Sequence, residues 1–118
     1  MSSLQNSVQL IGRPGIDPEI KKLGNSKLAK FSIATDDFYR NEKNELIKET
    51  SWHNVVAWNK QADMVERWVR KGKMIALEGK LKSRSYEDKE GVKRYITEIV
   101  ANDFFLIEKH VSDDQNNE

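Results

Sequence analysis

The chain has 118 residues, the size of one domain, and its 20 Lys and Arg against 19 Asp and Glu give a formal net charge of +1. With no Cys and two His, it lacks the residues for disulfides, thiolate metal sites or a histidine-rich zinc site. No apolar run approaches the ~20 residues of a membrane span, and the N-terminus has no signal-peptide pattern. We expect a cytoplasmic protein with no membrane partner, no metal and no cofactor.

Charge is distributed unevenly along this nearly neutral chain. Residues 66–84 contain seven Lys and Arg against two Glu, a net charge of +5. Residues 108–118 contain four acidic residues against one Lys, a net charge of −3. We therefore expect a folded domain over residues 1–108 with one basic face, followed by a short, acidic, disordered tail over residues 109–118.

Strand patterns dominate the chain. Alternating apolar residues or β-branched runs predict five strands, in chain order residues 8–12, 28–35, 49–58, 74–81 and 94–107. The charged residues 36–47 predict a long exposed loop between the second and third strands. Asp88-Lys89-Glu90-Gly91 predicts a hairpin turn between the last two strands.

One segment has helical periodicity. Apolar residues recur at helical spacing from Gln61 to Arg70, and Gly72 is expected to end the helix. Trp68 lies on the apolar stripe, so we interpret it as a core residue. The order of the elements has no βαβ alternation and predicts an all-β, five-stranded Greek-key barrel of the OB type, with one short helix between strands 3 and 4.

The third strand carries two tryptophans on one face. Strand alternation places Trp52, Asn54, Val56 and Trp58 together, and His53 on the opposite face. The two indoles are either a platform on which bases stack or part of the core, and from this strand alone the core is favoured.

Aromatic residues elsewhere shift that balance. Tyr39 adjoins Arg40 in the charged loop, Trp58 precedes Lys60, and Tyr86 follows Arg84. Rings interleaved with cations are what a flexible polyanion with stackable bases requires, although each pair could also be a solvated strand end. The remaining aromatics fit strand interiors or an interface: Phe31, Tyr95, Phe104 and Phe105. The sequence contains no catalytic motif, and we expect no catalytic residue.

Short motifs from residue 4 to about 108 resemble the bacterial-type single-stranded DNA-binding proteins. The resemblance includes a Gly-x-x-Gly-x-Asp-Pro-Glu turn over residues 12–19, a Trp-His strand over residues 50–55, and Leu-Glu-Gly-Lys-Leu over residues 77–81. Their order and spacing make the match specific. The resemblance implies a non-enzymatic OB-fold protein that coats and protects single-stranded DNA during replication, recombination and repair, associated with the bacterial nucleoid.

The resemblance also implies which residues act. The stacking positions fall on Tyr39, Trp52, Trp58 and Tyr86, and phosphate contacts fall at or beside Arg40, Lys60, Arg70, Lys71, Lys82 and Arg84. From their position and charge, we add Phe38, Arg13, Lys73 and Lys80 to the expected DNA-binding set. The family assembles as a homotetramer, so a homotetramer or a dimer is expected, with His53, Val8 and Leu10 at the interface.

The C-terminus departs from the family pattern. Typical members end in an acidic tip with Pro and Phe that recruits replication and repair enzymes, whereas this tail is short and has no apolar anchor. We therefore do not expect such enzymes to dock through it, and a plasmid or mobile-element version or a truncated chain would fit. Two alternatives remain open, an RNA-binding or primosome-type OB subunit and an OB-fold nuclease.

Overall fold

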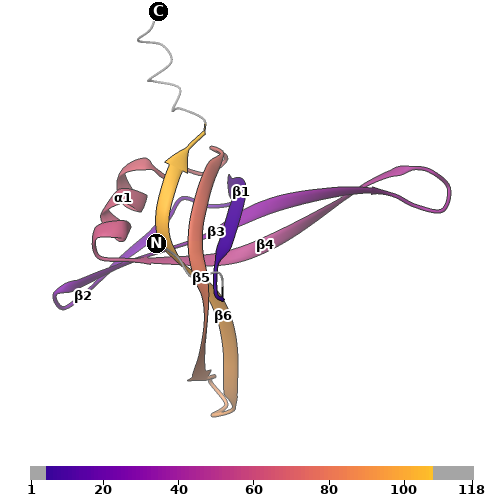
Figure 1. Ribbon diagram of the computed structural model, residues 1–118. Coiled ribbons are helices and arrows are strands. Elements are labelled where there is room, and N and C mark those ends of the chain that lie inside the picture. The colour runs from indigo at the N-terminus through magenta and orange to yellow at the C-terminus, as the bar shows by residue number, and fades with distance from the viewer. Residues whose placement is uncertain (1–4, 108–118) are drawn as a thin grey trace, which may run out of the picture.

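The computed structural model describes residues 5–107, which form six strands and one helix (Figure 1). In chain order these are β1 (Val8–Pro14), β2 (Glu19–Leu23), β3 (Ser26–Arg40), β4 (Leu46–Trp58), α1 (Lys60–Trp68), β5 (Ile75–Glu87) and β6 (Lys93–Leu106). The strands follow the order β1-β5-β6-β4-β3-β2, and a short β1–β3 pairing closes five of them into a barrel. The predicted five-stranded barrel and the position of its helix are confirmed. The expected tail over residues 109–118 lies outside the described residues.

A small apolar core fills the barrel. Inward-facing residues of β3 and β4 alternate with outward-facing ones, so that Phe31, Ile33 and Val55 are buried while their chain neighbours face the other side. Helix α1 adds Ala62 and Val65, both fully buried, to the same cluster. The core fixes which face of each long strand remains available to a ligand.

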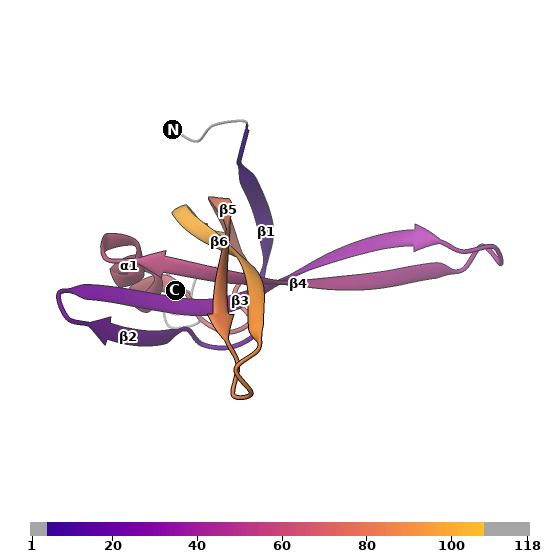
Figure 2. The same ribbon diagram turned by 90° about the horizontal axis from the view of Figure 1, so that it is seen from below.

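Two hairpins extend beyond the barrel in different directions (Figures 1 and 2). The first, which we call the β3–β4 arm, spans residues 34–52, and its strands stay in register from Ala34 opposite Trp52 to Arg40 opposite Leu46. The prediction of a loop over residues 36–47 was therefore wrong for most of that segment. A two-stranded ribbon exposes both faces to water, so charged residues are compatible with it, and only residues 41–45 form the turn.

The second hairpin, the β5–β6 arm, spans residues 83–97, from Ser83 opposite Thr97, and ends in the predicted turn. The Asp88 carboxylate accepts hydrogen bonds from the backbone N–H groups of Glu90 and Val92, and from Arg94 Nε at 3.0 Å. These bonds, that from Val92 foremost, hold the pKa of Asp88 below its ordinary value. Gly91 adopts the left-handed conformation with φ 81° that the turn requires.

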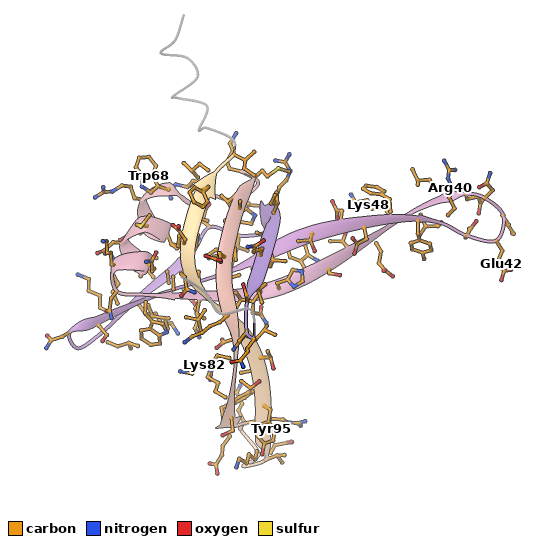
Figure 3. The ribbon with its side chains drawn as sticks, viewed as in Figure 1. Arg40, Glu42, Lys48, Trp68, Lys82 and Tyr95 are labelled. Atoms are coloured by element: carbon orange, nitrogen blue, oxygen red, sulfur yellow. The ribbon has the colours of Figure 1, made fainter. Side chains whose placement is uncertain are left out.

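Three further predictions differ from the structure. The short strand β2 pairs with β3 and was not predicted, because it has five residues, of which three are charged. Helix α1 ends at Trp68 rather than Arg70, because Val69 is already extended. Trp68 is 42% exposed rather than buried in the core, and Tyr95 stands exposed on the β5–β6 arm (Figure 3).

Candidate nucleic-acid interface

One face of the β3–β4 sheet carries both tryptophans of β4. Residues directly opposite in an antiparallel pair share a face, and here Trp52 pairs with Ala34 and Trp58 with Leu28. Trp52 is 60% exposed and Trp58 is 41% exposed, so neither is a core residue. The alternative that these rings fill the core is therefore wrong, and both present aromatic surface to solvent.

Two hollows lie next to this face, and each is lined on one side by residues of β3 and β4 and on the other side by residues of β5 and β6. The first is lined by residues that include Ile16, Ser32 and Asn54, and the second by residues that include Trp58 and Lys82. Because both hollows are also lined by Lys30, Val56, Arg84 and Glu98, we treat them as one surface and call it the groove.

Strand register explains why the groove carries positive charge. Lys30 pairs with Val56, Val56 with Val100, and Val100 with Lys80, so one row of side chains crosses four strands with a lysine at each end. Lys82 and Arg84 follow on β5 at alternate positions and therefore share the face of Lys80. Three cations, Lys30, Lys82 and Arg84, thus line the groove against one carboxylate, that of Glu98.

Tyr86 continues this face along the β5–β6 arm. It stands two residues beyond Arg84 on β5, lies opposite Arg94 of β6, and is about half exposed. Lys82 lies near the point where the arm leaves the barrel (Figure 3). The ring of Tyr86 therefore extends an aromatic and basic surface outward from the groove.

The β3–β4 arm places two of the predicted stacking residues, Trp52 and Tyr39, on opposite faces. Phe38 pairs with Lys48 and has the same parity as Ala34, so Phe38 shares the face of Trp52. Tyr39 pairs with Ile47 and lies on the opposite face of the arm. The four predicted stacking residues do not lie along one face, because three of them share the side of the groove and Tyr39 does not.

Three other residues of the predicted basic set make hydrogen bonds within the chain, Arg13 and Arg70 through their side chains and Lys71 through its backbone. Arg13 Nη1 donates to the carbonyl of Gly72 at 2.8 Å, which ties β1 to the loop before β5. Arg70 Nη1 donates to the carbonyls of Glu66 and Val69 at the C-terminal end of α1. The backbone N–H of Lys71 donates to Asp17 Oδ1 at 2.8 Å. These contacts hold the loop after α1 in place.

Lys60 and Lys73 lie away from the groove lining. Lys60 begins α1 and lines a separate polar hollow together with Lys22, Lys27 and Asp63. Lys73 lies in the turn before β5, where its N–H donates to the carbonyl of Arg70. Arg40 is near the tip of the β3–β4 arm, where its guanidinium donates to the carbonyl of Asn44 at 3.0 Å (Figure 3).

Sequence reasoning missed two charged residues of the groove, Lys30 and Glu98. The signal for Lys30 was present, since it alternates outward along a strand whose other face is apolar. Glu98 gave no signal of its own, because its partner Arg84 is 14 residues away on the other strand of the hairpin. The register of that hairpin, counted back from the turn, was needed to bring them together.

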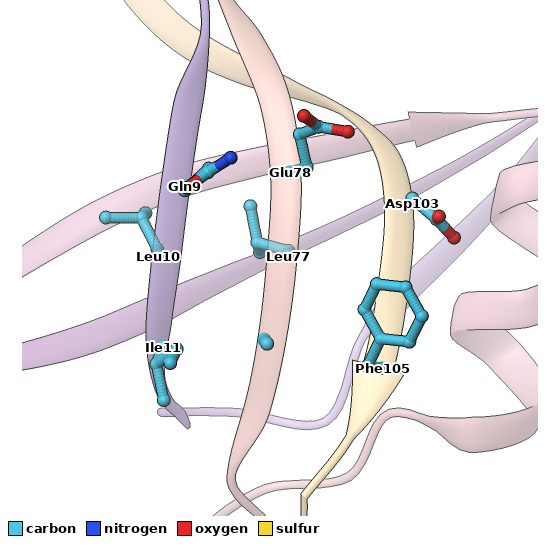
Figure 4. Close-up of a pocket in the computed structure, with 8 residues that line it drawn as sticks. Gln9, Leu10, Ile11, Leu77, Glu78, Asp103 and Phe105 are labelled. Atoms are coloured by element: carbon cyan, nitrogen blue, oxygen red, sulfur yellow. The ribbon is translucent and has the colours of Figure 1, made fainter. Parts of the chain in front are cut away.

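The predicted interface residues have partners within the chain. Val8 and Leu10 pack against the core, and His53 shares a 2.9 Å hydrogen bond with the hydroxyl of Thr35. The outer face of β1, β5 and β6 has a hollow with apolar residues on it, among them Ile11 and Phe105, which are both exposed (Figure 4). Among the described residues, no strand pairs with the outer edge of β1 before Arg13.

No helix within residues 5–107 is both long and apolar enough to cross a membrane. Over the same residues, no group of three or more His, Asp and Glu side chains could hold a metal ion.

Comparison with known proteins places this chain among related sequences. The model of the single-strand binding protein family matches residues 5–107. Single-stranded DNA-binding protein 1 of Chlorobaculum tepidum is 38% identical over 104 residues, which are 86% of this chain and 64% of that protein. Single-stranded DNA-binding protein 3 of Streptococcus agalactiae is 33% identical over 114 residues, covering 96% of this chain and 81% of that protein. This chain thus spans less than two thirds of the length of the first relative.

A solved structure agrees with the sequence matches. A Plasmodium falciparum SSB in complex with single-stranded DNA superposes with a TM-score of 0.78 at 35% identity, covering 92% of this chain and 98% of that one. The barrel with its one helix is therefore shared at the level of the whole domain, which confirms the predicted OB fold. Because the family match extends over all the described residues and the fold agrees, this chain belongs to the single-strand binding protein family.

Proposed function

We propose that this protein binds single-stranded DNA without sequence preference and protects it during replication, recombination and repair. The observation that carries the proposal is the groove, where the exposed ring of Trp58 lies beside Lys30 and Lys82. Trp52 extends the aromatic surface toward the β3–β4 arm, and Tyr86 extends it along the β5–β6 arm. Stacked rings bind any base through its π-face, while cations bind the phosphates.

The magnitudes support a binding role of useful strength. Base–aromatic stacking contributes roughly 1–3 kcal/mol per base, so a few rings yield substantial affinity without any base-specific hydrogen bond. Each neutralised phosphate releases counterions and adds about −0.7 to the slope of log K against log salt concentration. We propose stacking for Phe38 and phosphate contacts for Lys80, which share these faces, and we propose no catalytic role for any residue of the set predicted from the sequence.

The test is a titration with dT oligomers of increasing length. We expect quenching of tryptophan fluorescence, since Trp52 and Trp58 would stack on bases, and we expect affinity to fall as salt is added. An oligomer series that neither quenches nor depends on salt would refute the proposal. Competition with RNA oligomers separates the RNA-binding alternative, and incubation of labelled strands with Mg²⁺ tests for nuclease activity.

We further propose that the protein acts as a homo-oligomer, a tetramer or a dimer, on DNA in the bacterial cytoplasm. The exposed apolar side chains beside the hollow of Figure 4 and the unpaired edge of β1 support association with a second copy. A strand edge can pair with another strand, and burial of Ile11 and Phe105 would stabilise the contact. We do not propose that replication enzymes dock through the acidic tail, because the tail has no apolar anchor.

A further inference from the structure

A buried carboxylate lies in a groove that otherwise suits a polyanion. Glu98 is 8% exposed, and among the described residues lining the groove it is the one acidic side chain. An anion at this position would repel phosphate unless another group cancels its charge. The group that cancels the charge of Glu98 is the guanidinium of Arg84.

Glu98 holds Arg84 by two parallel hydrogen bonds. Arg84 Nε donates to Oε1 at 3.0 Å, and Arg84 Nη2 donates to Oε2 at 3.3 Å. This two-point geometry fixes both the position and the plane of the guanidinium. The Arg84 side chain is 45% exposed while that of Glu98 is 10% exposed, so the pair presents the arginine to a ligand and keeps the carboxylate beneath.

The pairing changes what Arg84 can offer to a nucleic acid. Opposite unit charges about 3 Å apart act on a distant phosphate as a dipole rather than as a cation, which removes most of the attraction. A guanidinium has five N–H donors, of which Glu98 uses two, so as many as three can face a ligand. Those donors suit the carbonyl oxygens of bases and the oxygens of sugars.

Resting on the single-stranded DNA binding proposed above, we propose that Glu98 makes Arg84 a neutral hydrogen-bonding contact of the groove rather than a phosphate-neutralising one. Lys30 and Lys82 then supply the phosphate-neutralising charge of the groove. Glu98 is a positioning residue in this scheme, since it acts on the DNA through Arg84.

The test measures the slope of log K against log salt concentration for a dT oligomer. Removing only the carboxylate charge, with Glu98→Gln, should make the slope steeper by about 0.7, because Arg84 becomes an unpaired cation. The double variant R84Q/E98Q removes a neutral pair, so its slope should equal that of the original protein. Its affinity should still fall by about two- to tenfold, because hydrogen bonds to the DNA are lost.

Two controls calibrate the measurement. Lys82→Gln removes an unpaired groove cation and should make the slope shallower by about 0.7. Glu66→Gln removes a carboxylate that pairs with Lys27 outside the groove, and it should leave the slope unchanged. Thermal unfolding of each variant verifies that the barrel is intact.

The outcomes separate this inference from the proposed function. If the double variant has a slope as shallow as that of Lys82→Gln, Arg84 neutralises a phosphate in the original protein and the inference is wrong. A folded Glu98→Gln variant with an unchanged slope would also overturn it. If the unmodified protein shows no salt-dependent binding at all, the proposed function itself fails.

Discussion

At the scale of single residues, a glycine sets the position of the Trp52 ring. A Cβ atom at Gly15 would lie 2.5 Å from Cζ3 and 2.8 Å from Cη2 of that indole, closer than real carbon atoms approach. The Gly15 N–H donates to the carbonyl of Ser32, which keeps the turn beside the groove. The sequence places these residues 37 positions apart, and only the fold brings the turn beneath the ring.

The variant Gly15→Ala should move the Trp52 ring without unfolding the protein, because an exposed ring can rotate away from the new methyl group. We expect weaker binding of dT oligomers, up to the ~1–3 kcal/mol of one stacking contact, with little change in melting temperature. Fluorescence titration and thermal unfolding measure the two effects. In a Trp52→Ala background the same substitution should cause no further loss, and a full additional loss would show that Gly15 acts by another route.

At the scale of elements, the β3–β4 arm presents two chemically different faces. The face of Phe38 and Trp52 carries Lys48 and Arg40 against one carboxylate, that of Asp36, which pairs with Lys48. The face of Tyr39 carries Asp37 and Glu49 and, among the alternating residues of the arm, no Lys or Arg. Phe38 and Trp52 are four strand positions apart in pairing, roughly 13 Å along the arm, so they would stack on different bases. A short strand of DNA can follow the first face without touching the second.

Phe38→Ala should therefore weaken a dT oligomer of about eight nucleotides, which is within the ~4–16 nucleotides that an OB fold binds. Tyr39→Ala serves as the matched variant and should leave the affinity for that short oligomer nearly unchanged. Fluorescence titration measures both, since neither change removes a tryptophan. Equal weakening by the two variants would show that the strand crosses from one face of the arm to the other.

At the scale of the whole molecule, the outer face of β1, β5 and β6 is where a second copy would add. Ile11→Glu should shift the protein toward the 13.7 kDa monomer, because a charge on an apolar contact surface resists burial. Equilibrium sedimentation measures the mass. Val92→Glu makes the same chemical change at an exposed apolar residue in the β5–β6 turn and should leave the mass unchanged. A variant at Ile11 that assembles like the original protein would exclude this face.

Local sequence patterns were enough to predict the barrel, its helix and the β5–β6 turn. Alternation identifies strands whose one face is buried, and a Gly three residues after an Asp in a polar run identifies a tight turn, since both depend on nearby residues. The pairing of aromatic with basic residues likewise indicated the class of ligand. Strand β2 and the β3–β4 arm escaped prediction because charged residues interrupt the apolar alternation in both.

By itself, the sequence determined the fold class, the family resemblance and the side chains that suit single-stranded DNA. Only the tertiary structure decided that Trp52 and Trp58 are exposed, that Tyr39 lies on the far side of the arm, and that Glu98 lies beneath Arg84. The physical reason is that register between strands sets which side chains share a face. That register depends on pairing across the whole sheet, which no single segment encodes.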